Sequence, residues 1–201
     1  MFDVLIIGGG ASGLSCALIL GSAKDMPFAK DKKIGIIAHQ RTSHLHDALL
    51  NNVLGVPSGT TGKSVLQNGK AKLASQYPHV VQIDKEKVFK ISLNKDGFLV
   101  ETNKNSYVSK IVVVAVGYTD LFTIKGLEKY IEPHPRAKVE KHRIWLKNTN
   151  HLIENNLYVV GTLAGWRSQF AVASGSGAQV ATDILTLWNN GEHTKVHDKI
   201  Y

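Results

Sequence analysis

The chain has 201 residues, of which 43% are hydrophobic and 20% are charged, with a formal net charge of +8. This length allows one sizeable core and is short for two full domains. No apolar run is long enough to cross a membrane as a helix, and the apolar N-terminus lacks the basic leader of a signal peptide. The single cysteine, Cys16, excludes an internal disulfide and a Cys-x-x-Cys redox pair within the chain. We therefore expect a cytoplasmic protein without a membrane span.

The positive charge could indicate nucleic acid or an anionic surface as a partner. The lysines, however, are spread over the whole chain, and no basic helix or ladder of aromatic side chains accompanies them. We expect no nucleic-acid partner. A solvated basic surface, which would also favour a phosphate-rich cofactor, explains the composition better.

The N-terminal residues carry the strongest pattern. Residues 3–7 are a continuous apolar run, typical of a strand buried on both faces, and residues 14–23 have the composition of a helix. Between them stands Gly8-x-Gly10-x-x-Gly13. In this setting Gly8 allows a tight turn, Gly10 lets a pyrophosphate approach the backbone, and Gly13 lets the helix pack on the strand. The pattern predicts a dinucleotide site, the alternative being a glycine-rich turn in an ordinary α/β protein.

Residues 33–38 read as a second buried strand that completes a βαβ unit. An acidic residue at the end of this strand usually binds the ribose hydroxyls. Here the position falls on Ala38 or His39, and neither is acidic. His39, Gln40 or Arg41 could bond the ribose or an adenosine phosphate instead, or His39 could be an ordinary surface histidine.

Two weaker patterns are set aside. His39, His44 and His46 lie close in sequence, but without cysteine and with little acid nearby we expect no metal site. Gly-Lys-Ser at 62–64 resembles the end of a P-loop, yet the glycine that the motif needs five places earlier is Pro57. We interpret it as a loop that caps a helix over residues 64–76.

The remaining elements follow in order. Strands are expected at 80–83, 88–93, 98–102 and 111–116, a loop at 119–127, irregular structure at 130–141, a last strand at 157–160 and a helix at 169–189. The first turns of that helix are rich in small residues, so they could lie against a flat ligand or another helix, and we favour the ligand. The order predicts a doubly wound α/β fold: a central parallel sheet with helices on one face and an antiparallel β-meander on the other.

Four of these segments resemble the flavin-binding domain of the thioredoxin reductase-like pyridine nucleotide-disulfide oxidoreductases. Residues 3–14 are similar to the FAD phosphate loop, and 87–117 are similar to the hairpin strands that end in the family's Ala-Thr-Gly turn, here Ala115-Val116-Gly117. Residues 119–127 are similar to the loop that follows. Residues 157–185 are similar to the Gly-Asp segment and the closing helix.

The resemblance implies that FAD is the cofactor of a Rossmann-like FAD-binding domain. It places the pyrophosphate on Gly8, Gly10, Ala11, Ser12 and Gly13. It implies contacts to the adenosine ribose at the turn after Ile37, with Ala38, His39, Gln40 and Arg41, and to the adenine through the backbone of Val88. Ala115 and Gly117 would lie near the cofactor. Gly161 and Thr162 would meet its ribityl and phosphate end, and Gln169 and Phe170 would face the flavin pyrimidine.

The departures from the family are equally informative. Only about 40 residues, 118–156, separate the two flavin segments, too few for the family's second dinucleotide domain. The redox Cys-x-x-Cys is absent, and Thr162 stands where the Gly-Asp motif has aspartate. We therefore expect one FAD-binding domain over 1–201, in which 1–117 and 157–190 form the flavin-binding halves and 118–156 is a short connection.

These features favour a flavoprotein oxidoreductase that passes electrons between bound FAD and an external donor or acceptor, either a small molecule or a redox protein, and not a dithiol thioredoxin reductase. A non-catalytic electron carrier, redox sensor or subunit of a larger complex is the alternative. A nucleotide fold that binds NAD, or nothing, comes third. No catalytic residue is assigned; Trp166, Arg167 and His134 are weak candidates. A homodimer is one way to cover apolar surface left by a missing domain.

Overall fold

The main sheet is built around the first strand of the chain. The computed structural model describes residues 1–39, 45–119 and 121–197. Among these residues, β1 (Phe2–Ile7), β2 (Ile34–Ala38), β5 (Val81–Asp84), β8 (Ser106–Val114), β11 (Leu152–Glu154) and β12 (Leu157–Val159) stand in the order β11-β12-β8-β1-β2-β5. All pairs are parallel except β11 with β12. The predicted central parallel sheet is confirmed.

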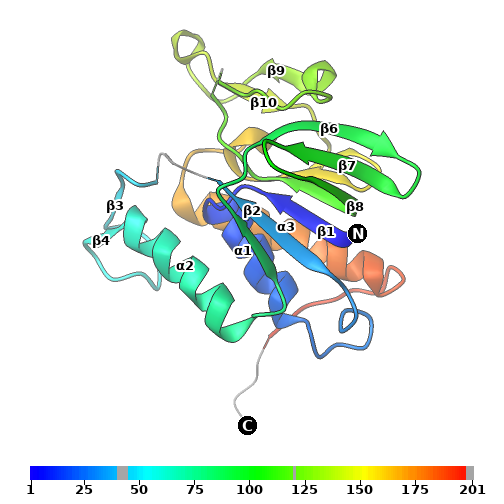
Figure 1. Cartoon of the computed structure of the whole chain (residues 1–201). Helices are drawn as coiled ribbons and strands as arrows, with labels where there is room; N and C mark the ends of the chain where they lie inside the picture. Colours follow the sequence, from blue (N-terminus) through cyan, green and yellow to red (C-terminus); the bar gives the residue numbers. More distant parts are fainter. Residues whose placement is uncertain (40–44, 120, 198–201) are drawn as a thin grey trace.

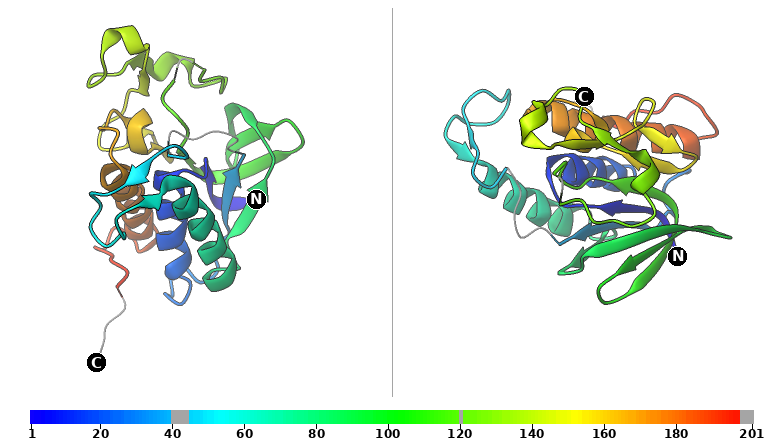
Figure 2. Two further views of the ribbon diagram at one scale, coloured as in Figure 1. Left: turned by 90° about the vertical axis from the view of Figure 1, so that its left-hand side faces the viewer. Right: turned by 90° about the horizontal axis from the view of Figure 1, so that it is seen from above.

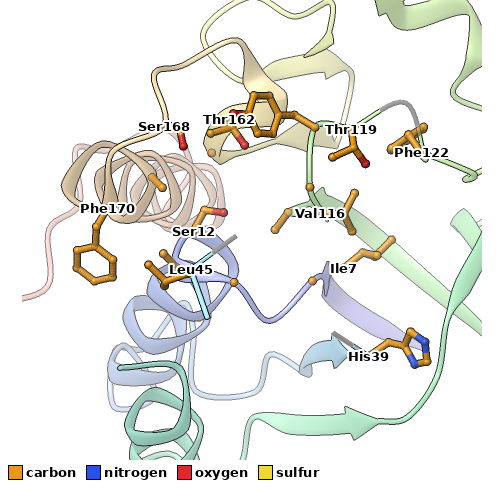
Figure 3. Close-up of a pocket in the computed structure, with 18 of the residues that line it drawn as sticks. Ile7, Ser12, His39, Leu45, Val116, Thr119, Phe122, Thr162, Ser168 and Phe170 are labelled. Atoms are coloured by element: carbon orange, nitrogen blue, oxygen red, sulfur yellow. The ribbon is translucent and has the colours of Figure 1, made fainter. Parts of the chain in front are cut away.

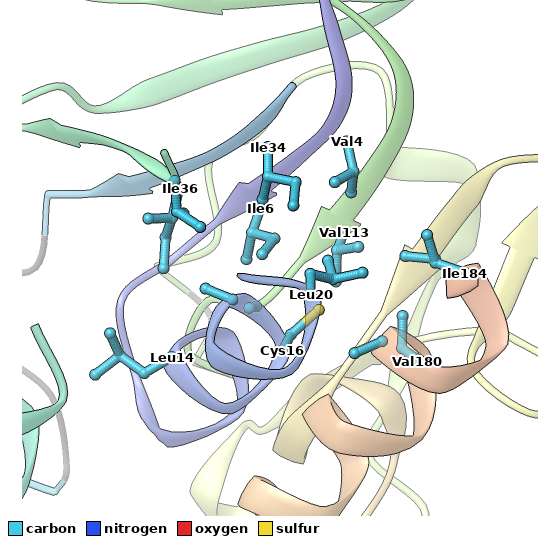
Figure 4. Close-up of a cluster of buried hydrophobic side chains, with 14 of the residues drawn as sticks. Val4, Ile6, Leu14, Cys16, Leu20, Ile34, Ile36, Val113, Val180 and Ile184 are labelled. Carbon is cyan, nitrogen blue, oxygen red and sulfur yellow. The ribbon is translucent and has the colours of Figure 1, made fainter. Parts of the chain in front are cut away.

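Three helices cover one face of this sheet: α1 (Ala11–Ser22), α2 (Gly62–Gln76) and α3 (Phe170–Trp188) (Figures 1 and 2). Val4 and Ile6 of β1 point into this layer and pack with Leu20 of α1 and Ile184 of α3 (Figure 4). Cys16 lies in the same core with no exposed surface, and burial raises the pKa of its thiol. It is therefore a small packing residue rather than a reactive thiolate.

The opposite face carries the meander. β6 (Val88–Asn94) pairs antiparallel with β7 (Gly97–Thr102), and β7 pairs antiparallel with β8. Leu5 and Ile7, the alternate residues of β1, pack on this side with Val112 and Val114. The apolar run of β1 is thus explained by burial on both faces.

The strand expected at 111–116 is longer and ends earlier than the sequence suggested. β8 begins at Ser106, because residues 106–109 pair with β7, and ends at Val114. Its first half has one face exposed, so its sequence lacks the continuous apolar character of its second half.

The connection between β8 and β12 is compact. It contains η1 (Glu128–Tyr130), β9 (Ile131–Pro133), η2 (Val139–Lys141), β10 (Ile144–Leu146) and β11, and its described residues form no α-helix. β9 and β10 make an antiparallel hairpin, which corrects the expectation of wholly irregular structure at 130–141. Periodicity could not reveal strands of three residues. Two further short pieces are a β3 (Leu49–Leu50)–β4 (Thr60–Thr61) ribbon and η3 (Gly161–Ala164). Among the described helices, none combines the length and hydropathy needed to cross a bilayer.

Candidate functional site

A cleft of about 850 Å³ opens at the carboxyl end of β1, between the starts of α1 and α3 (Figure 3). This is the position where open α/β sheets bind their ligands. The volume lies in the range of small-molecule and cofactor sites. Of the predicted cofactor residues, the following line it: Gly8, Gly10, Ala11, Ser12, His39, Val88, Ala115, Gly117, Gly161, Thr162, Gln169 and Phe170.

The glycine loop forms the floor of the cleft. Gly8 has φ +121°, and a Cβ there would lie 2.3 Å from the Ala115 carbonyl oxygen, so only glycine fits the turn. Gly13 does not line the cleft: its own Cβ position lies 1.9 Å from the Gly8 carbonyl oxygen, where the helix packs on the loop. Gly10 is the N-cap of α1. Within the described chain no side chain caps this helix, and its first turn carries no acid, so its first amides can meet an anion.

A second helix start reaches the same cleft. Gln169 is the N-cap of α3, no described side chain caps it, and Gln169 and Phe170 both line the cleft. Of the small residues that follow, some face the cleft and others face α1. Ala173 lines the cleft, but a Cβ on Gly177 would lie 1.9 Å from the Ser12 carbonyl oxygen of α1. The expectation that these small residues face a ligand is therefore wrong for Gly177, which serves helix packing.

The end of β2 supplies His39 to the cleft but not Ala38. Side chains alternate along a strand, so Ala38 points to the helical face, where its Cβ lies 2.8 Å from the position of a Cβ on Gly9. His39 lines the cleft, and its buried Nδ1 has no hydrogen-bond partner among the described residues. The predicted contacts at Gln40 and Arg41 lie outside the described residues.

A buried carboxylate that the sequence analysis did not identify also lines this end. Glu86 accepts hydrogen bonds from the Thr102 hydroxyl at 2.6 Å, the Asn105 amide at 2.7 Å and the Tyr107 hydroxyl at 3.0 Å. Burial by itself raises the pKa of Glu86. The three hydrogen-bond donors lower it by more than burial raises it, so the net shift of the pKa is downward. Glu86 is thus ionised and ties the loop before Val88 to the turn between β7 and β8. In sequence it looks like one of many surface acids.

The far end of the cleft lies between Gly117 and the Gly161–Thr162 turn. A Cβ on Gly117 would meet nothing within 4 Å, so this glycine faces open space. His134 lies behind the wall, with its ring centroid 5.3 Å from that of Tyr118. The amide of Arg136 donates to its Nδ1 at 3.1 Å, so we assign the proton to Nε2, which donates to the Thr162 carbonyl at 3.0 Å.

None of the three weak catalytic candidates lines the cleft. His134 holds the Thr162 turn from behind, and burial lowers its pKa, which keeps the ring neutral. Trp166 is 41% exposed and packs under the guanidinium of Arg136 at 5.2 Å instead of over the cleft. Arg167 is exposed on the same loop. The sequence suggested these residues because they lie close in sequence to segments expected to bind the cofactor. Closeness in sequence does not determine on which side of a loop a side chain points.

Two walls of the cleft were not predicted, because they come from loops without a periodic pattern. One wall is formed by β3 and the residues on both sides of it, and the other is formed by the loop after β8. The first wall contributes Leu45, Asp47, Ala48, Leu49, Leu50 and Asn52. The second contributes Val116, Tyr118, Thr119, Leu121, Phe122, Thr123 and Ile124.

The fold and the cleft together define a Rossmann-like nucleotide-binding domain with two helix starts directed at one site. The chain belongs to the pyridine nucleotide-disulphide oxidoreductase family, whose model matches residues 2–165. The resemblance drawn from the sequence is thereby confirmed.

Individual relatives are distant. An uncharacterized oxidoreductase CzcO of Bacillus velezensis is 25% identical over 194 residues, which are 92% of this chain and 52% of that relative. The chain thus spans about half the length of the curated relatives it matches. A thioredoxin reductase from Gloeobacter violaceus has a similar structure, with a TM-score of 0.75 at 15% identity, covering 99% of both chains. An oxidoreductase from Agrobacterium tumefaciens has a TM-score of 0.74 at 13% identity, covering 92% of this chain and 98% of that one.

Proposed function

We propose that this chain binds FAD in the cleft and exchanges electrons between the flavin and an external donor or acceptor. One observation carries the proposal: the glycine loop and the start of α3 line the same cleft. This cleft lies at the carboxyl end of β1, where the chain continues to β2 on one side of β1 and to β8 on the other. Flavin chemistry is the cofactor's own; the protein supplies binding, orientation and electrostatics.

The residues present suit such a cofactor. The uncapped start of α1 would hold the diphosphate, since its amides and dipole favour negative charge and none of Gly8, Gly10, Ala11 or Ser12 is acidic. Peptide groups near Val88 would meet the adenine. The start of α3 would stabilise negative charge on the reduced ring, and Gly117 leaves room beside it.

A dithiol relay within this chain has no support. The only cysteine is Cys16, which is fully buried between α1 and the sheet, with the pKa of its thiol raised. Electrons would therefore come from outside the chain. The second reading is a flavin-binding subunit or carrier whose donor site lies on another protein. A homodimer remains a prediction.

The first experiment is a titration of the purified protein with FAD, followed by absorbance and flavin fluorescence. We expect stoichiometric uptake. Gly117→Val should weaken FAD binding at least about ten-fold, about 1.4 kcal/mol, without loss of thermal stability, because the new side chain enters open space in the cleft. Gly175→Ala, on an exposed position outside the cleft, is the control. A protein that takes up no FAD refutes the proposal.

Turnover then separates the two readings. Reduction of the bound flavin by NADH, NADPH, reduced ferredoxin or quinols is followed by stopped-flow absorbance. Turnover with one of these supports the oxidoreductase. A stable yellow protein that none of them reduces faster than free FAD, and that purifies with a partner, supports the subunit or carrier.

A further inference from the structure

A basic segment lies next to the cleft. Residues 125–147 contain seven Lys or Arg against three Glu, a net of +4, which is half of the formal charge of the whole chain. They form β9, η2, β10 and the turns around them, and Figure 1 shows this hairpin on the opposite side of the sheet from α1 and α2. Lysines are spread along the whole sequence, but the net charge is not, because residues 125–147 contain few acids to balance their lysines and arginines.

Two of the three acids of this segment have partners, while the third, Glu140, is exposed between Lys138 and Lys141 and forms no ion pair with a described residue. Glu128 accepts a backbone amide at 2.7 Å, and Glu132 pairs with Lys147 at 3.2 Å. Lys138 and Lys141 are exposed on the loop that joins β9 to β10 and form no ion pair with any residue in the described ranges. Their charges are therefore available to an external anion.

The loop is fixed against the wall of the cleft. Arg136 donates a hydrogen bond to the Gly165 carbonyl and stacks on Trp166, while His134 bonds the carbonyl of Thr162, which lines the cleft. A protein that contacts this loop would consequently sit beside the end of the cleft opposite the adenosine site.

Exposed apolar side chains lie among the cations. Val139 is 84% exposed at the hairpin tip, and Trp166 is 41% exposed under Arg136. A small apolar centre with charges around it is typical of the transient interfaces of redox proteins, which are small and steered by charge.

We propose that this basic face, formed by Arg136, Lys138, Lys141 and Arg167 around Val139 and Trp166, docks an acidic electron-carrier protein. The inference rests on the proposed function, because the carrier would exchange electrons with FAD in the cleft. A second copy of the chain fits poorly, since both copies carry +8. In each encounter one electron passes between the carrier's redox centre and the flavin, so one is oxidised as the other is reduced, and solvent supplies or takes up the protons.

The test uses FAD-loaded protein and an acidic [2Fe–2S] ferredoxin that has been reduced with dithionite and desalted. Stopped-flow absorbance gives the second-order rate of flavin reduction. Lys138→Glu/Lys141→Glu should lower this rate about ten-fold at low salt, and about 0.5 M salt should remove most of the difference. The matched control, Lys24→Glu/Lys30→Glu, changes the charge equally at exposed positions before β2, at the amino end of the parallel strands and away from the cleft, and should stay within about two-fold.

FAD uptake is measured first in every variant, and its absence in the wild type refutes the proposed function rather than the docking face. With uptake intact, equal rates for the two double variants would overturn the docking proposal. A homodimer that the Lys138→Glu/Lys141→Glu variant dissociates, or RNA bound at this face at physiological salt, would also overturn it.

Discussion

Gly175 and Gly177 lie two residues apart on α3 but in opposite surroundings. A Cβ at 177 would lie 1.9 Å from the Ser12 carbonyl oxygen, whereas one at 175 would meet nothing within 4 Å. Gly177→Ala should destabilise the protein by about 1–3 kcal/mol, because α1 and α3 must move apart. Gly175→Ala should be neutral or stabilise by up to about 1 kcal/mol, since alanine favours the helix. Urea unfolding measures both, and equal effects would contradict the packing described here.

The same comparison explains what the small residues are for. A close approach of two helices requires glycine at the point of contact, because any side chain would meet a carbonyl group. The contact packs the first turn of α1 against α3 at Gly177, one helical turn after Ala173, which lines the cleft.

At the scale of the element, the β9–β10 hairpin depends on a few polar contacts with η3. His134 provides one of them, to the Thr162 carbonyl, and it also accepts a hydrogen bond from the Arg136 amide within the hairpin loop. His134→Ala should raise amide exchange in residues 134–143 about five- to ten-fold, because each lost hydrogen bond contributes about 1 kcal/mol. Hydrogen exchange followed by mass spectrometry measures this. Lys138→Ala, on the same loop without such bonds, is the control, and similar exchange in the two variants would show that the hairpin is held by other contacts.

For the whole molecule, acid should lower stability through buried histidines. Burial lowers the pKa of His134 and His151 below the ordinary value of 6.5. The unfolded chain then binds protons that the folded chain does not. The stabilisation is complete above about pH 6.5 and is lost as the pH falls through the lower folded pKa. We expect Tm to fall between about pH 7.5 and about pH 5.5.

His151→Asn tests the assignment. Asparagine tolerates the φ of +74° at this position, and its amide can donate to the Val159 carbonyl as the His151 ring does. The variant should show a shallower fall of Tm over this pH range. His193→Asn, at an exposed position, should keep the wild-type slope. Burial raises the pKa of Asp183, and this shift opposes the loss of stability that the histidines cause in acid. The contribution of His151 is therefore measured by comparing the pH dependence of Tm in the two variants. Equal slopes in the two variants would contradict the assignment.

Much of the architecture could be predicted because it depends on local patterns. The apolar strands of residues 3–7 and 33–38, with the glycine spacing and the helix between them, determine a βαβ unit on their own, since burial on both faces demands a continuous apolar run. The order of the later strands added the meander. β9, β10 and β11 escaped prediction because they are short and mostly not buried, so they lack the apolar run by which β12, of the same length, was recognised.

The amino-acid sequence by itself determined the class of fold, the phosphate-type loop and the absence of a dithiol within the chain, since these depend on residue identity at fixed spacing. Only the tertiary structure decided which residues share the cleft. Ala38 turns away while His39 enters, and Glu86 becomes a buried, hydrogen-bonded carboxylate. Trp166 faces Arg136 from another segment, and Lys138 and Lys141 come to lie on a loop that is fixed beside the cleft. The reason is physical: the direction of a side chain and its neighbours from distant segments are set by packing, which no local pattern encodes.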